Sequence, residues 1–131
     1  MTEYLILYVA TALIFFPLDF VWLSSTAKGL YRAELGNLLL ASPNMMVAGL
    51  FYLAYLLGVV ILVSAPADGD VLKALVTGGV LGLVAYGTYD LTNLATMSGF
   101  SAKIAAIDMI WGAALTGISA AGGVWISTAF A

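Results

Sequence analysis

The chain has 131 residues, of which 63% are hydrophobic and 8% are charged, and its mean hydropathy is +1.10. Soluble domains carry about a quarter charged residues, so this composition excludes a soluble protein and predicts one integral membrane domain, residues 1–131. Cysteine and histidine are both absent. Their absence excludes disulfides, thiolate chemistry, and any metal, haem or pigment held by either residue. A net charge of −3 argues against a nucleic-acid partner.

Four apolar stretches follow one another along the chain, each long enough for the roughly 20 residues that a helix needs to cross a bilayer. They lie at about residues 4–25, 43–64, 71–97 and 104–130. The runs are continuous rather than alternating, which favours helices over the strands of a barrel. The first run is not a signal peptide, because Glu3 stands where a basic region is expected. The predicted fold is all-α, a bundle of four transmembrane helices.

The connection between the first two stretches, roughly Lys28 to Leu40, is longer than the others and amphipathic. It is either a short helix along the membrane surface or an ordinary interfacial loop.

Basic residues favour one orientation in the membrane. Lys28, Arg32 and Lys103 fall on the connections between stretches one and two and between three and four, whereas Lys73 is alone on the opposite side. Cytoplasmic loops carry an excess of Lys and Arg. We therefore expect a multi-pass protein of a bacterial inner membrane, cytoplasmic or intracytoplasmic, with both termini in the periplasm.

The two halves of the chain resemble each other. Asp19 aligns with Asp90 at an offset of 71 residues, and Asn44 aligns with Asp108 at an offset of 64. A duplicated two-helix hairpin explains this pattern, and so does chance similarity among apolar helices.

Polar and aromatic residues gather at one end of the predicted helices. Asp19 and Asp90 lie near the ends of the first and third stretches, and Asp108 lies near the start of the fourth, so all three face the same side of the membrane. Helical spacing places further residues on the same faces. The predicted intramembrane polar cluster is Asp19, Trp22, Asn44, Tyr86, Tyr89, Asp90, Asn93, Asp108 and Trp111.

Two interpretations of these carboxyl groups stay open. An isolated aspartate costs about 2.5–3.5 kcal/mol at the bilayer centre, so each must be protonated, hydrogen-bonded or hydrated. Lys103 is within reach of Asp108, and Lys28 or Arg32 of Asp19. The carboxyl groups are either hydrogen-bonding partners that lock the bundle, or the working groups of a proton or cation relay or of an intramembrane enzyme.

Small residues predict close helix packing. They are spaced by four, which lets two helix backbones approach each other, and they comprise Gly78, Gly82, Ala113, Gly117 and Ala121. Ala113 and Gly117 lie on a different face from Asp108. That face is either a docking surface for a partner subunit or part of the internal packing.

Three motifs carry a family resemblance: Asp19-x-x-Trp22, the run from Tyr89 to Thr96 (Tyr-Asp-Leu-Thr-Asn-Leu-Ala-Thr), and Asp108-x-x-Trp111-Gly112. With them the chain resembles, over its whole length, an uncharacterised family of small bacterial four-helix membrane proteins. It also looks like the four-helix scaffold subunit type of photosynthetic core complexes. The resemblance implies the fold and a place in a larger assembly, and it assigns no activity.

The function we expect is that of a non-catalytic accessory or scaffold subunit within a membrane complex, most concretely a reaction-centre and light-harvesting core. Its partners are then other transmembrane subunits and lipids. No catalytic residue and no metal site are expected, and no cofactor is held by histidine or cysteine; contact with lipid, quinone or pigment stays open. The alternatives are a small proton- or cation-coupled transporter, or an enzyme modifying lipid or isoprenoid, using Asp19, Asp90 and Asp108.

Overall fold

The computed structural model describes residues 2–36 and 44–130, and within them it contains helices and turns but no strand. Four helices are long and apolar enough to cross a membrane, which confirms the predicted all-α transmembrane fold. The elements in chain order are α1 (Thr2–Thr26), the π-helical turn η1 (Ala27–Tyr31), α2 (Arg32–Leu35), α3 (Met45–Val59) continued by η3 (Val60–Ser64), α4 (Val71–Thr96) and α5 (Ala102–Ala129). Residues 37–43, which end the amphipathic connection, lie outside the described residues.

Three of these helices begin at a polar side chain that accepts a hydrogen bond from the backbone. Asn44, Asp70 and Ser101 each accept from the amide three residues ahead, at 3.0–3.2 Å. Such caps satisfy amide groups that the first helical turn leaves without partners. The starts of α3, α4 and α5 are therefore set by the local sequence.

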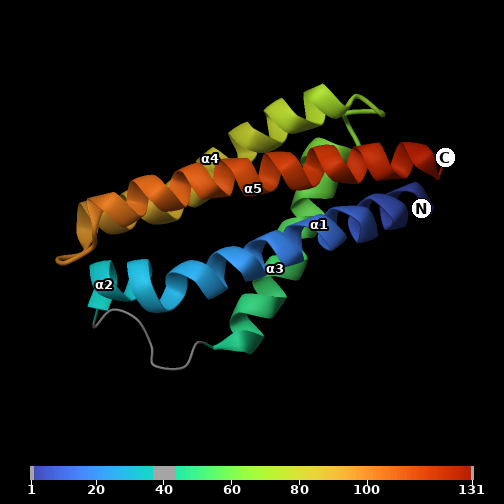
Figure 1. Ribbon diagram of the computed structural model, residues 1–131. Helices are drawn as coiled ribbons and strands as arrows, with labels where there is room; N and C mark the ends of the chain where they lie inside the picture. Colours follow the sequence, from blue (N-terminus) through green and yellow to red (C-terminus); the bar gives the residue numbers. More distant parts are fainter. Residues whose placement is uncertain (1, 37–43, 131) are drawn as a thin grey trace.

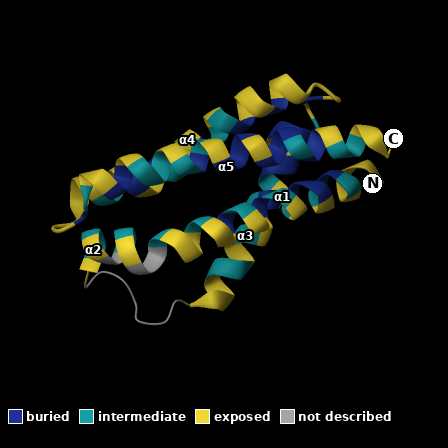
Figure 2. Cartoon of the chain, viewed as in Figure 1, coloured by how far each residue is buried: buried dark blue, intermediate teal, exposed yellow. Residues whose placement is uncertain are grey.

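Helix α5 is the centre of the fold. α4 packs along one side of it and α1 along another, and both run antiparallel to α5 (Figure 1). Burial follows this order: half of the apolar window of α5 is buried, against 28% or less in the other three spans. In Figure 2 the buried residues concentrate on α5 and where α3 approaches it.

Helix α3 takes a different direction from the other three (Figure 1). It is anchored at its C-terminal end, where Val59, Val60 and Val63 join a buried apolar cluster with Leu7 and Val124. Its N-terminal half is mostly exposed. The four spans are thus not a closed bundle, and the α1–α3 and α4–α5 hairpins pack dissimilarly, unlike the two similar hairpins that a duplication predicts.

The contact between α4 and α5 depends on glycine. A Cβ atom added to Gly78 would lie 3.0 Å from the Cα of Gly117, and one added to Gly117 would lie 2.9 Å from the carbonyl oxygen of Leu75. Gly82 faces the backbone of Gly112 at still closer range. Small residues permit this approach, and dispersion between the two backbones then holds the helices together.

Of the two alternatives for the small-residue face of α5, these contacts favour internal packing. Gly117 and Ala121 are buried within the chain, and Ala113, half-buried, lies beside α4 near Gly79. These small residues pack inside the chain, because the glycines among them allow the backbone of α4 to approach that of α5. A second close approach, which the sequence did not suggest, places Gly122 and Gly123 against Ile14 and Thr11 of α1.

Candidate functional site

The register between α4 and α5 brings two carboxyl groups together. The ring of Tyr86 on α4 lies directly over Gly112 of α5, where a Cβ would overlap it. Because the two helices are antiparallel, one further turn along α4 and one turn back along α5 lead from this pair to Asp90 and Asp108. The two carboxyl groups are neighbours.

Asp90 and Asp108 differ in their surroundings. The Asp90 side chain is 0% exposed, and neither of its carboxyl oxygens has a hydrogen-bond partner among the described residues. Asp108 is half-buried and accepts a hydrogen bond of 2.9 Å from the hydroxyl of Tyr31. A buried carboxyl without a donor is costly, so Asp90 is the member of the pair that packing alone does not explain.

Tyr31 reaches this site from η1. Its hydroxyl donates to Asp108 and accepts a bond of 3.1 Å from the indole nitrogen of Trp22. Burial raises the pKa of the Tyr31 hydroxyl above its ordinary value, and the neighbouring Asp108 carboxyl raises that pKa further. The phenol is therefore a neutral donor at physiological pH.

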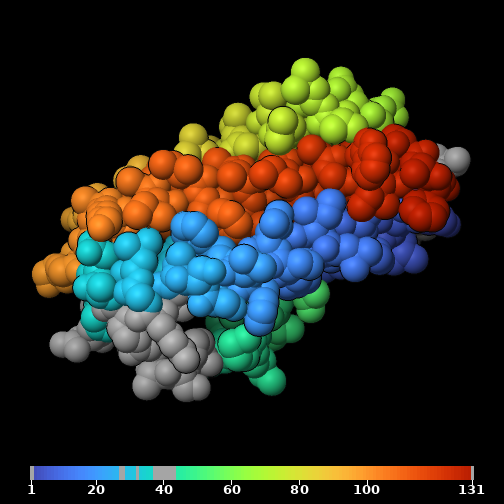
Figure 3. Space-filling model, in the orientation of Figure 1, coloured from blue at the N-terminus to red at the C-terminus, as the bar shows by residue number. Residues whose placement is uncertain are grey.

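Helix α2 lies over the start of α5 and holds η1 in place. The hydroxyl of Ser101, the cap of α5, donates to a carboxylate oxygen of Glu34 at 2.7 Å. Figure 3 shows α2 in contact with the first part of α5 on the visible face. η1 and α2 thus cover the end of the fold at which the aspartate side chains lie.

A pair of stacked tryptophans forms the other side of the site. The rings of Trp22 and Trp111 lie 4.6 Å apart, with 7° between their planes. The indole nitrogen of Trp111 donates to Asp19 at 3.4 Å, a long bond, and Tyr52 of α3 is the other polar neighbour of Asp19. Asp19, 5% exposed, is therefore paired with aromatic donors rather than with another carboxyl group.

Most of the predicted polar cluster is present. The structure brings together Asp19, Trp22, Tyr86, Asp90, Asp108 and Trp111. Three predicted members do not join them. Asn44 caps α3, Tyr89 is mostly exposed with its ring against Phe100, and Asn93 is a half-buried residue of α4.

Two members were missed by the sequence interpretation, Tyr31 and Tyr52. Tyr31 belonged to a segment that the pattern predicted to lie at the surface. Tyr52 sits in an apolar run with no polar neighbour in sequence. Of the three basic residues predicted to approach the carboxyl groups, Lys103 is exposed, and the side chains of Lys28 and Arg32 lie outside the described part of the chain.

The side chains of the cluster can exchange protons and form hydrogen bonds. Among the described residues, no group of three or more acidic side chains is arranged to hold a metal ion. What the site offers is a carboxyl pair, a phenol and two indole donors in an apolar setting.

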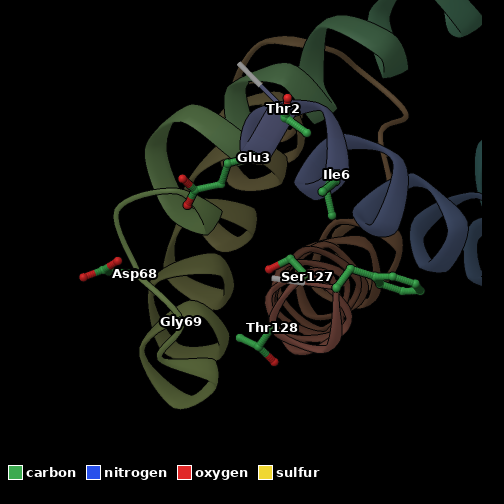
Figure 4. A pocket seen from close by; sticks show the side chains of 8 residues that line it. Thr2, Glu3, Ile6, Asp68, Gly69, Ser127 and Thr128 are labelled. Atoms are coloured by element: carbon green, nitrogen blue, oxygen red, sulfur yellow. The ribbon is translucent and has the colours of Figure 1, made fainter.

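Two cavities lie elsewhere. One, about 430 Å³, is at the end of the molecule where the termini meet, between the start of α1, the turn at Asp68 and Gly69, and the end of α5 (Figure 4). The other, about 250 Å³, is an apolar groove between α3 and α4. Its lining residues are Phe51, Ala54, Tyr55, Gly58, Val59, Leu62 and Leu81.

Four apolar spanning helices that bury carboxyl groups near one membrane surface define a multi-pass membrane protein. The chain belongs to the family described as "Predicted membrane protein (DUF2177)", whose model matches residues 4–125. No curated protein and no solved structure matches the chain.

Proposed function

We propose that this protein is a non-catalytic accessory subunit that packs against another transmembrane subunit through the groove between α3 and α4. The observation that supports this proposal is the divergence of α3 from α4, which leaves the apolar groove open along the middle of the α3 span.

The small residues of the groove suit a helix as its occupant. Ala54 and Gly58 are four residues apart and both line it, and a Cβ added to Gly58 would meet nothing within 4 Å. Close helix–helix packing in membranes uses this small-xxx-small spacing, because it lets a second backbone approach. On α4 and α5 the same kind of spacing is already filled by the chain itself, whereas on α3 no described residue packs against Gly58.

The host that the family resemblance suggests is a photosynthetic reaction-centre and light-harvesting core in a bacterial inner membrane. There the protein would lie between helices of larger subunits, in contact with lipid, quinone or pigment, without ligating any pigment through histidine. The positive-inside bias of the loops supports periplasmic termini.

The experiment is site-directed cross-linking in native membranes, which the absence of cysteine makes clean. Gly58→Cys places a thiol in the groove, and Leu13→Cys, on the exposed face of α1, is the matched control. We expect a reagent joining thiols to amines, or a photoreactive maleimide, to give one discrete product from Gly58→Cys, identified by mass spectrometry as a transmembrane subunit. Equal products from both variants, or only lipid adducts, would contradict the proposal.

A second function, proton-coupled transport or intramembrane acid–base catalysis by Asp19, Asp90 and Asp108, is favoured by the buried and unpartnered Asp90. Asp90→Asn separates the two. An accessory subunit keeps its partner and its stability with asparagine at this position, whereas a transporter or enzyme folds normally and loses activity.

A further inference from the structure

The geometry points to a binding site for one exchangeable proton, shared between the carboxyl groups of Asp90 and Asp108. This inference deepens the second candidate function and does not depend on the α3–α4 groove. The ligand is the proton itself, taken up from the membrane side that η1 and α2 cover.

The first argument is the position of Asp90. Its side chain is wholly buried, and its neighbour in the α4–α5 interface is the carboxyl group of Asp108. Two carboxylates in an apolar interior repel each other, but a carboxylic acid beside a carboxylate forms a strong hydrogen bond. One proton therefore gives one of the unpartnered Asp90 oxygens a hydrogen-bond partner and removes one of the two negative charges of the pair.

The second argument is the division of roles within the pair. Tyr31 donates to Oδ1 of Asp108, which stabilises the charged form of that carboxyl group. Asp90 has no such donor, so the shared proton resides on Asp90 and is donated to Asp108. When the proton leaves, both groups are carboxylates. Asp108 keeps the hydrogen bond from Tyr31, and Asp90 has no described donor.

The titratable groups around the pair come from five elements. Asp108 approaches from α5 and Tyr31 from η1, and Tyr86 and Tyr89 are the neighbours on α4 itself. Asp19 of α1 and Tyr52 of α3 lie near enough to Asp108 to interact with it electrostatically. A phenol, with an ordinary pKa of about 10, is neutral at physiological pH, so the carboxyl groups are the ones that can carry an exchangeable proton there. Asp19 has a donor of its own, the indole nitrogen of Trp111.

The site is close to water although it is buried. Asp90 is six residues before the end of α4 at Thr96, about 9 Å along the helix axis. Among the described residues, the short connection from Met97 to Ser101 and the η1–α2 segment lie toward this end of the molecule. A proton therefore has about two helical turns to cover between the end of α4 and Asp90.

The test is infrared spectroscopy of the full chain in lipid nanodiscs, reading the carbonyl stretch that only a protonated carboxyl group gives. The wild-type minus Asp90→Asn difference spectrum should contain a band of one carboxyl group at neutral pH, shifted in deuterium oxide. Raising the pH should remove the band and lowering it should restore the band. Far-UV circular dichroism verifies that the variant is folded.

Two further variants decide whether the proton is shared. In Asp108→Asn the Asp90 band should change frequency or vanish, because its acceptor has been replaced. Asp19→Asn, the matched control, should leave the Asp90 band unchanged. A missing band in wild type, a band that Asp108→Asn does not alter, or a band constant at every pH would each overturn the inference, while leaving the cross-linking test of the groove unaffected.

Discussion

Gly112 determines whether Tyr86 can lie where it does. The tyrosine ring occupies the space that a Cβ at position 112 would need, and one turn further the same interface holds Asp90 against Asp108. Because Gly112 has no side chain, α4 and α5 can adopt the register that places Asp90 beside Asp108. In the sequence it stood beside Trp111 as part of a motif, with no indication of what it faced.

Gly112→Ala should destabilise the protein by about 1–3 kcal/mol, because the added methyl group overfills a packed interface. The midpoint of thermal unfolding in detergent measures this loss. Gly49→Ala is the control: a Cβ at Gly49 meets nothing within 4 Å, and alanine is the better helix former. A Gly112→Ala protein as stable as the Gly49→Ala protein would show that Tyr86 moves away without cost.

The tryptophan stack gives a spectroscopic test of the site. Two stacked indoles, with ring centroids 4.6 Å apart and nearly parallel planes, should couple their transitions and produce a paired band in the circular dichroism spectrum. Trp22→Phe and Trp111→Phe should each abolish this signal. Trp125→Phe should retain it, because the third tryptophan of the chain is 66% exposed and far along α5. Persistence of the signal in Trp111→Phe would contradict the arrangement.

At the scale of elements, η1 is the segment that connects the membrane-spanning core to its polar end. Its π-helical turn rotates the residues after α1 relative to an uninterrupted α-helix. The side chain of Tyr31 therefore reaches Asp108 of α5. α2 continues from this turn and is fixed by Glu34 on Ser101. Among the described side chains, Tyr31 and Glu34 therefore tie this segment to α5 and to its N-terminal cap.

Tyr31→Phe should release η1 and α2 from α5. The variant loses the bond to Asp108 and the acceptor for Trp22, a loss of about 0.5–2 kcal/mol. Hydrogen–deuterium exchange of residues 27–36 should increase, while exchange in the centre of α5 stays slow. Tyr4→Phe, at an exposed residue, is the control and should change neither. Unaltered exchange in Tyr31→Phe would show that the hydrogen bond between Ser101 and Glu34 is enough to keep η1 and α2 on α5.

The contribution of Tyr31 to stability should also depend on pH in a defined direction. Its pKa is raised in the folded protein, so the neutral hydroxyl is favoured there. The stabilisation is complete below the unfolded-state value of about 10 and decreases as the pH rises through the raised value. The difference in unfolding midpoint between wild type and Tyr31→Phe should be constant from neutral pH to about 10 and shrink only above it.

At the scale of the whole molecule, the sequence predicted the spans well and their arrangement poorly. Continuous apolar runs and capping residues such as Asp70 and Ser101 mark where helices begin, which is local information. The direction of α3 and the central place of α5 depend on which small residues meet, and many glycines offer equivalent spacings. The stripe through Gly117 illustrates this: its spacing indicated close packing, but its partner helix was not encoded in the spacing.

The candidate site was predicted to a similar extent. Asp19, Asp90 and Asp108 were found because charge is conspicuous in an apolar chain, and alternating helix direction places them at one end. Tyr31 was missed because its role depends on a π-helical turn, and Tyr52 because its contact crosses between diverging helices. Long-range partners of uncharged aromatic side chains leave no periodic signal in the sequence.

The orientation of the molecule in the membrane can be tested with single cysteines. The structure places the turn at Pro66 and the connection at Ser98 at opposite ends of α4, and both residues are exposed. If the positive-inside bias holds, a membrane-impermeant maleimide added to intact spheroplasts should label Pro66→Cys and spare Ser98→Cys. After lysis both should react. The reverse pattern would place the termini in the cytoplasm.

The central position of α5 has a consequence for biogenesis. It is the last of the four spans to leave the ribosome, yet α1 and α4 find their main packing surface on it. Until it is inserted, Asp19 lacks Trp111 and Asp90 lacks Asp108, and the earlier helices wait in the translocon or the lipid with unsatisfied polar groups. The core of this protein is therefore completed only once α5 has been inserted, and a chain interrupted before α5 keeps these polar groups without their partners.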